Sequence, residues 1–223
     1  TLRSMAHLTC ASQSRDQIRR VIGSYAAAGV RHVLAIRGDM PGGPRVPFEA
    51  HPEGLRNATE LVAMVRELGN FCVGVAAFPE PHPERNDHDL DARILVDKAN
   101  AGASFAVTQL FFTAADYFAL VDRVRALGCD LPIIPGIMPI TNLRQLKRFA
   151  ELSGAALPAS VIDRVQAVAD DEEQVRKVGI LIATELSEQL LAGGAPGLHF
   201  FTQNRSRATR EIYANLHQER RRA

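Results

Sequence analysis

Short apolar runs rich in β-branched residues alternate along this chain with segments in which apolar residues recur at helical spacing. Runs of the first kind are typical of buried strands, and segments of the second kind predict amphipathic helices. Strands separated by helices pair in parallel, because the chain must cross back over the sheet before each new strand. The sequence therefore predicts an α/β fold with a parallel sheet covered on both faces. The predicted strands are Met5–Cys10, His32–Ile36, Cys72–Phe78, Phe105–Phe112, Ile133–Ile137 and Leu198–Thr202.

The helical segments begin and end at residues that favour helix termini. Ser14 followed by Gln17 matches a capping box, in which each residue satisfies a backbone N–H of the other. Glycine, which commonly ends a helix, follows four of the segments. These stop signals are Ala28-Gly29, Leu68-Gly69, Ala101-Gly102 and Leu127-Gly128. The longest predicted helix has an unbroken apolar face formed by Val175, Val178, Ile182, Leu186 and Leu190.

The length of 223 residues suits a single α/β domain. A closed barrel and an open, doubly wound sheet both fit the alternating pattern. No Gly-x-Gly-x-x-Gly follows any predicted strand, which counts against a dinucleotide-binding Rossmann unit. We find no internal repeat and no interdomain linker in the sequence.

Charge and cysteine usage exclude several classes of protein. With 26 Lys plus Arg against 25 Asp plus Glu, the chain has no global field that would attract nucleic acid or a membrane surface. The basic run Arg220–Arg222 is interpreted as a solvated tail. Cys10, Cys72 and Cys129 lie far apart in apolar surroundings, which predicts reduced thiols in a cytoplasmic protein. No run is long and apolar enough to cross a membrane, and Thr1–Cys10 lacks the layout of a signal peptide.

Polar residues gather where the predicted strands end, and in a parallel barrel that edge carries the active site. Arg37-Gly38-Asp39 follows the second strand, Glu80 and His82 follow the third, and Arg205 lies shortly after the sixth. Gln109 falls inside the fourth predicted strand, where its amide must find a partner. Taken alone, Gln109 is better interpreted as a tie between strands. The fifth strand leads into Pro135-Gly136-Ile137-Met138-Pro139. Such residues at five strand ends together favour a ligand site.

Other chemistries have little support. The segment from His82 to Asp91 holds several histidines and aspartates, but their spacing matches no zinc pattern. A solvated or phosphate-contacting loop is the better interpretation, and we predict no metal site. The sequence also lacks a nucleophile elbow, a phosphate-cradling glycine loop and a strand lysine suited to Schiff-base chemistry.

At these strand ends the sequence resembles the methylenetetrahydrofolate reductase family. The similar segments appear in the family's order and are similar to its third to eighth strands; the first and second have no counterpart here. The segments are His7–Cys10, Arg31–Asp39, Ala76–Glu84, Ala101–Phe112, Pro135–Ile140 and Pro196–Phe200. The resemblance implies a (β/α)₈ barrel, with residues 1–223 forming one catalytic domain that is incomplete at its N-terminus.

The resemblance also implies a function in one-carbon metabolism. NADH or NADPH would give hydride to flavin adenine dinucleotide (FAD), and 5,10-methylenetetrahydrofolate would accept it to become 5-methyltetrahydrofolate. Asp39 would lie between flavin and folate, Gln109 would bond the pterin, and Arg205 would reach the folate. The residues expected to hold FAD are His7, Arg37, Gly38, Asp39, Ala58, His82, Asp91 and Lys98.

Departures from the family pattern leave alternatives open. The family's first strand carries a catalytic glutamate in a Glu-Phe-Phe-Pro context, and we expect that acid upstream of this sequence. Asn57 and Ile94 stand where relatives place aromatic or polar flavin contacts, and Leu143 replaces an aromatic residue that stacks on substrate. Direct hydride transfer from NADH to the folate, a non-catalytic folate-binding barrel, and a folate-handling lyase or methyltransferase remain alternatives. The sequence decides neither NADH against NADPH nor monomer against homo-oligomer.

Overall fold

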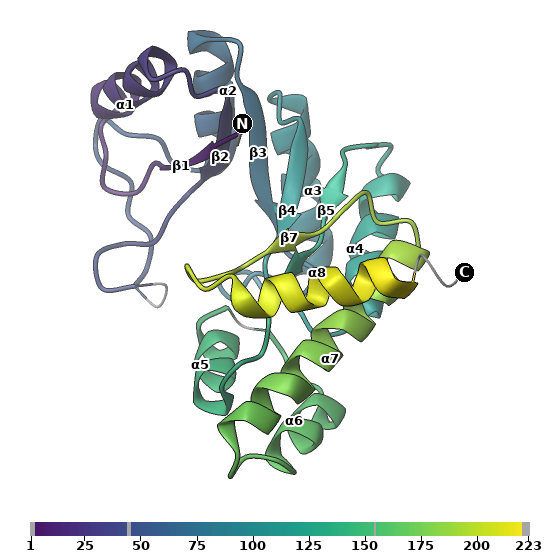
Figure 1. Cartoon of the computed structure of the whole chain (residues 1–223). Helices are drawn as coiled ribbons and strands as arrows, with labels where there is room; N and C mark the ends of the chain where they lie inside the picture. Colours follow the sequence, from purple (N-terminus) through teal and green to yellow (C-terminus); the bar gives the residue numbers. More distant parts are fainter. Residues whose placement is uncertain (1–2, 44–45, 154, 220–223) are drawn as a thin grey trace. The chain divides into compact units, whose positions relative to one another are not determined.

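The computed structural model describes residues 3–43, 46–153 and 155–219, in which strands and helices alternate (Figure 1). The strands are β1 (Met5–Thr9), β2 (His32–Ile36), β3 (Cys72–Ala77), β4 (Phe105–Thr108), β5 (Ile133–Ile134), β6 (Gly136–Ile137) and β7 (His199–Phe200). The helices are α1 (Arg15–Ala27), α2 (Ala58–Leu68), α3 (His88–Asn100), α4 (Ala114–Ala126), α5 (Leu143–Ser153), α6 (Ala159–Gln166), α7 (Glu172–Ala192) and α8 (Arg207–Glu219).

The chain divides into two compact units, each described by itself. Unit 1 comprises Thr1–Ala77, Asp89–Val107 and Arg123–Pro132. Unit 2 comprises Phe78–His88, Thr108–Asp122 and Ile133–Ala223.

In unit 1 the strands lie side by side in chain order. β1 pairs with β2 and β2 with β3, both in parallel, with Met5 opposite His32 and His32 opposite Cys72. The Ser104 N–H donates to Val73 O at 2.7 Å and so places β4 beside β3. The Ala106 N–H donates to Pro132 O at 2.8 Å, so the segment that leads into β5 comes next.

In unit 2 the strands also lie in chain order. The Gly136 N–H donates to the Thr108 hydroxyl at 2.8 Å, which places β6 beside the last residue of β4. β6 then pairs in parallel with β7, with Gly136 opposite His199. Within the described residues, neither unit reverses its strand order, whereas a doubly wound sheet must do so. The predicted α/β class with a parallel sheet is confirmed, and the strand order is that of a barrel.

Several predicted strands were wrong in extent. The sixth, predicted over Leu198–Thr202, covers only His199–Phe200. The first and third each end one residue earlier than predicted. The fourth ends at Thr108, so Gln109 lies just beyond the strand instead of inside it. Its side-chain oxygen accepts the Leu110 N–H at 2.9 Å, and this local bond replaces a strand-to-strand one. The fifth is divided at Pro135, which has no N–H to give to a ladder.

The predicted helix boundaries are confirmed where they were made. Gln17 N–H donates to the Ser14 hydroxyl at 3.3 Å, and Ser14 N–H donates to the Gln17 side chain at 2.8 Å, which completes the capping box. Helices α6 and α8 were not predicted. The buried apolar residues of α8 are Ala208, Ile212 and Leu216, a stripe of one residue per turn among polar neighbours. The basic run Arg220–Arg222 lies outside the described residues.

The core of unit 2 is an apolar cluster that α7 closes. Val175 and Ile182 of α7 pack with Leu110, Met138 and Ile140. α7 lies beside α6 and α8 (Figure 1). Burial of such side chains supplies the main stabilisation of the fold.

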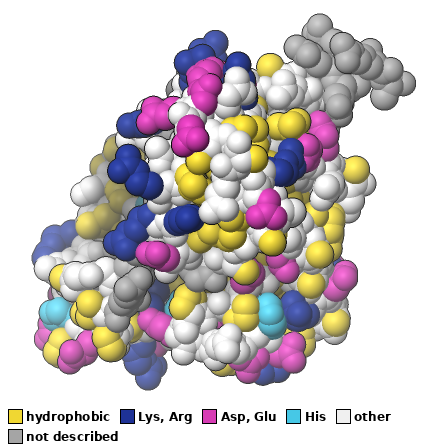
Figure 2. All heavy atoms as spheres, turned by 90° about the horizontal axis from the view of Figure 1, so that it is seen from below, with side chains coloured by type: hydrophobic (Ala, Val, Ile, Leu, Met, Phe, Trp, Pro, Cys, Tyr) yellow, Lys and Arg dark blue, Asp and Glu magenta, His cyan; other side chains and the backbone are white. Residues whose placement is uncertain are grey.

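Surface charge is mixed in sign. Figure 2 shows Lys and Arg side chains interspersed with Asp and Glu on the face in view. Among the described helices, none combines the length and apolarity needed to span a membrane.

Gly179, in the middle of α7, allows the helix to approach the strand connection closely. A Cβ atom at this position would overlap the carbonyl oxygen of Ile140, which is backbone and cannot swing away. We expect Gly179→Ala to lower the free energy of unfolding by about 1–3 kcal/mol through overpacking. Thermal denaturation followed by circular dichroism measures the change.

Gly23 in α1 provides the matched control, because a Cβ there meets nothing within 4 Å. Gly23→Ala should be neutral or stabilise the protein by up to about 1 kcal/mol, as alanine restricts the unfolded chain. Equal melting temperatures for the two variants would contradict the close approach of α7.

Candidate active site

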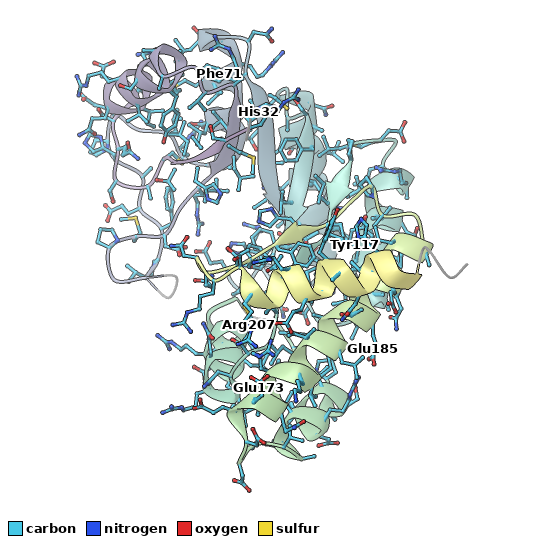
Figure 3. All side chains as sticks on the ribbon, viewed as in Figure 1. His32, Phe71, Tyr117, Glu173, Glu185 and Arg207 are labelled. Atoms are coloured by element: carbon cyan, nitrogen blue, oxygen red, sulfur yellow. The ribbon has the colours of Figure 1, made fainter. Side chains whose placement is uncertain are left out.

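The carboxyl ends of β1, β2 and β3 are level with one another in unit 1. Thr9 stands opposite Ile36, and the N–H groups of Cys10 and Ala11 both donate to Arg37 O, at 3.1 and 2.9 Å. His32 and Phe71 lie at the opposite, amino-terminal ends of β2 and β3 (Figure 3). Arg37 therefore lies on the edge of the sheet where a parallel α/β fold carries its site.

Arg37, Gly38 and Asp39 make a tight turn off β2. The Arg37 guanidinium lies 4.7 Å from the ring centre of Phe48, a cation–π arrangement that fixes its direction. Gly38 has φ +82°, and a Cβ there would lie 2.7 Å from Cβ of Thr9. Only glycine fits this turn, and the turn leaves the Asp39 carboxylate exposed.

Helix α3 brings two buried charged residues to the same unit. Asp91 is 5% exposed and Lys98 is 8% exposed, and they stand two helical turns apart on one face. The Lys98 ammonium donates to Ala76 O at 2.8 Å, near the carboxyl end of β3. β2 and β3 are paired up to Ala35 and Val75, so Ala76 and Arg37 follow within two residues on neighbouring strands. Two cationic side chains thus reach one edge of unit 1.

His7 and Ala58 also belong to unit 1. His7 lies within β1 with an exposed side chain, and Ala58 is the buried first residue of α2. Asn57 is the N-cap of α2, where its side-chain oxygen accepts the Glu60 N–H at 3.0 Å. An asparagine at this position is thus explained by helix capping. Ile94 is half-buried in α3.

Cys10 lies under the same edge and is fully buried. Its thiol contacts Arg37 O at 3.5 Å. Burial raises the pKa of the Cys10 thiol to about 11, so it stays protonated near neutral pH. All three cysteines are free, which agrees with the prediction of reduced thiols.

In unit 2, the loop after β3 is held by its own side chains. The His82 ring packs edge-on against Phe78 at 4.7 Å, and its Nδ1 accepts the Glu84 N–H at 3.2 Å. The Glu80 carboxylate accepts the Ala156 N–H at 2.8 and 3.1 Å, and so ties this loop to the connection between α5 and α6. Burial raises the pKa of Glu80, the bond from Ala156 opposes that shift, and the charge of Asp116 adds to it.

A cleft of about 670 Å³ opens in unit 2 beside the end of β7. Arg205 lines it with an exposed side chain. Its guanidinium makes no hydrogen bond or ion pair within the part of the chain that the structure describes. The lining residues are Met138, Pro139, Ile140, Thr141, Asn142, Gln145, Leu146, Glu172, Glu173, Arg176, Phe201, Thr202, Gln203, Arg205, Arg207 and Ala208.

Sequence reasoning missed the charged part of this cleft. Glu173 lies near the start of α7 and Arg207 near the start of α8 (Figure 3). Both line the cleft together with Arg176. Leu143, which stands where relatives have a substrate-stacking aromatic residue, does not line the cleft and packs against the apolar cluster of unit 2. Arg176 forms an i,i+3 pair with Glu173, which is common on helix surfaces, and its partner Glu211 on α8 is 35 positions away.

The expected site residues are divided between the units. Unit 1 holds His7, Arg37, Gly38, Asp39, Ala58, Asp91 and Lys98. Unit 2 holds His82, Gln109 and Arg205. The described residues contain no group of three or more His, Cys, Asp or Glu side chains arranged to hold a metal ion. These residues can recognise anions through the guanidinium groups of Arg37 and Arg205 and the ammonium group of Lys98. Gln109 can form hydrogen bonds through its amide.

Comparison with a family model and with curated sequences points to one family. Residues 1–217 match the family model described as methylenetetrahydrofolate reductase. The 5,10-methylenetetrahydrofolate reductase of Escherichia coli (strain K12) is 36% identical over 215 residues, which cover 96% of this chain and 70% of the relative. The probable methylenetetrahydrofolate reductase (NADPH) of Caenorhabditis elegans is 35% identical over 216 residues, covering 96% of this chain and 32% of that protein.

A solved structure supports the fold. An uncharacterized protein from Clostridium thermocellum, described as binding two copies of 5-methyl-5,6,7,8-tetrahydrofolic acid, superimposes with a TM-score of 0.51. It is 13% identical, and the match covers 94% of this chain and 92% of that one. At that identity the likeness extends to the fold alone.

Glu80 allows a test of the loop after β3. Because its pKa is raised, ionised Glu80 destabilises the folded protein, and the stability it carries is lost as the pH rises through the raised pKa. Glu80→Gln removes the charge and keeps an acceptor for the Ala156 N–H. We expect the variant to melt at a higher temperature than the parent at pH 7. The difference should vanish as the pH falls below the ordinary value of 4.5.

Glu67→Gln is the control, since Glu67 is an exposed carboxylate on α2. It should not reproduce the pH-dependent gain. A lower melting temperature for Glu80→Gln at pH 7 would mean that the bond to Ala156 outweighs the cost of burial.

Proposed function

This chain belongs to the methylenetetrahydrofolate reductase family, and we propose that its strand ends carry the reduction of 5,10-methylenetetrahydrofolate to 5-methyltetrahydrofolate with FAD as cofactor. NADH or NADPH supplies the hydride. The observation that carries the cofactor assignment is the pair of cations, Arg37 and Lys98, at one edge of unit 1. That pairing suits the pyrophosphate of a dinucleotide.

The residues of unit 1 fit FAD. The chemistry that FAD supplies when bound is two-electron transfer between the nicotinamide and the folate. Lys98 is buried and Arg37 is held by Phe48, so both charges are fixed before a ligand arrives. Gly38 leaves backbone space for close approach, and Asp91 and His7 add polar contacts. The family resemblance assigns His82 to the same cofactor.

Asp39 is assigned to the boundary between flavin and folate. Its carboxylate is exposed on a turn that only glycine at position 38 allows. A negative charge beside the flavin opposes further negative charge there and so favours passing hydride onward.

Gln109 and Arg205 are assigned to the folate. The Gln109 side-chain oxygen is oriented by the Leu110 N–H, which fixes the plane of its amide for the donor and acceptor edge of a pterin. The exposed guanidinium of Arg205 suits a carboxylate of the folate, because a charge-assisted pair is stronger than a neutral hydrogen bond.

Flavin-independent transfer from NADH is the second candidate, and the observation in its favour is that Asn57 and Ile94 lack the family's flavin contacts. Its weight is reduced because Asn57 caps α2. FAD therefore remains the proposed cofactor.

Cofactor use is tested with the purified protein. We expect an absorption spectrum with flavin bands after incubation with FAD, and oxidation of NADH or NADPH by 5,10-methylenetetrahydrofolate only in its presence. Full turnover without FAD would establish direct transfer. Binding of 5-methyltetrahydrofolate without any turnover would point to a non-catalytic folate-binding protein.

Asp39 separates the two half-reactions. We expect Asp39→Asn to leave the melting temperature and the reduction of flavin by NADH unchanged and to slow transfer to folate at least about 10-fold, as expected when a charge near the reacting centre is lost. Stopped-flow absorbance of the flavin measures both steps. Asp130→Asn, at a fully exposed carboxylate of the same unit, is the control. Equal folate rates in the two variants would remove Asp39 from the mechanism.

A further inference from the structure

A network of two arginines and two glutamates joins α7 to α8 in unit 2. Arg176 donates through Nη1 to both oxygens of Glu211, at 2.9 and 2.8 Å. It donates through Nε and Nη2 to Glu173, at 3.0 and 2.8 Å. Arg207 donates through Nε to Glu211 at 3.2 Å.

Arg176 is the centre of this network. Its side chain is 15% exposed, whereas Glu173 is 50% and Arg207 is 74% exposed. Hydrogen bonds to Arg176 lower the pKa values of Glu173 and Glu211, so both carboxylates stay ionised well below neutral pH. One planar guanidinium therefore holds carboxylates from two helices in a fixed geometry.

The network holds the start of α8, because Arg207 is the first residue of the helix and Glu211 lies one turn further along the same helix. Below it, Ala208 and Ile212 are buried on the same helix. Apolar packing alone would let α8 shift along its axis. The hydrogen bonds from Arg176 to both carboxylate oxygens of Glu211 oppose such a shift.

The loop that precedes α8 needs such an anchor. Gln203 and Asn204 have φ values of +50° and +59°, a conformation that residues with a side chain adopt at a cost. The Arg205 N–H donates to Thr202 O at 2.8 Å and closes the turn. One flank of the turn is the short strand β7, and the other is the start of α8.

Of the three arginines that line the cleft, Arg205 is the one whose guanidinium makes no hydrogen bond or ion pair within the described residues. Arg176 and Arg207 are engaged by carboxylates, and Arg205 is not. The direction of the Arg205 side chain follows from the turn, and the turn depends on where α8 begins.

We propose that Arg176 is a positioning residue, which holds the start of α8 through Glu211 and thereby places Arg205 for the folate. The inference rests on the proposed role of Arg205 in folate binding. Arg176 itself does not contact the ligand, because its donors are taken up by Glu173 and Glu211.

The test is a double-mutant cycle read by calorimetric binding of 5-methyltetrahydrofolate, which does not depend on turnover. Arg205→Ala should weaken binding about 10-fold, as expected for one charged hydrogen bond. Arg176→Met should weaken it about 5-fold, and the double variant should bind no more weakly than Arg205→Ala alone, because coupled residues are not additive. Arg176→Lys should recover part of the loss.

Arg164→Met is the matched control. Arg164 makes a two-point pair with Glu185 between α6 and α7, at 2.6 and 3.0 Å, and does not line the cleft. It should leave binding unchanged even if it lowers the melting temperature. Where Arg176→Met does not fold, Glu211→Gln breaks the same contact from α8 and takes its place in the cycle.

The outcomes separate the two proposals. If Arg205→Ala weakens binding and Arg176→Met does not, the positioning role is overturned and the folate role of Arg205 stands. If the two losses multiply, Arg176 acts independently of Arg205 and the positioning role is again overturned. If Arg205→Ala has no effect, the folate role of Arg205 fails, and the inference fails with it.

Discussion

Parallel pairing is the constraint on which the candidate site of this protein depends. Because β1, β2 and β3 run in the same direction and are level in register, their carboxyl ends fall on one edge. Arg37 leaves the sheet at that edge, and Lys98 reaches it from α3 through a bond to Ala76 O. Two residues far apart in the sequence thus bring their positive charges to the same edge of the sheet. The helices then have two functions, covering the apolar faces and delivering side chains to the edge.

Much of this arrangement could be predicted from the sequence, for reasons that are local. The capping box at Ser14, the stop signals and the strand starts follow from short-range preferences, and Arg37-Gly38-Asp39 was recognisable because it directly follows a strand. Gln109 was predicted inside the fourth strand but is the first residue after it. The prediction failed because apolar residues continue to Phe112, although the strand ends at Thr108. Pro135 carried a signal that was overlooked, since a residue without an N–H must interrupt a ladder.

What could not be predicted arises from pairs that are distant along the chain. Arg176 and Glu211 are 35 positions apart, and in the sequence each alone has the pattern of an ordinary helix surface charge. Glu80 and Ala156 are 76 positions apart, and only the fold makes the carboxylate an anchor for that backbone N–H. Gly179 is a similar case, because the residues next to it in the sequence do not indicate that the Ile140 carbonyl packs against it. Function is more easily seen at strand ends than at the helix contacts that support them.

The interruption at Pro135 also bears on motion. β6 and β7 share a ladder of two residues each, with His199 N–H bonded to Pro135 O and Phe201 N–H bonded to Ile137 O. So short a ladder opens at a small fraction of the free energy that unfolds the whole domain. In amide hydrogen exchange these two protons would be released by local fluctuation, while those of β2 would wait for global unfolding. The strand that leads to Arg205 can therefore open locally, beside the cleft, while the longer strands stay paired.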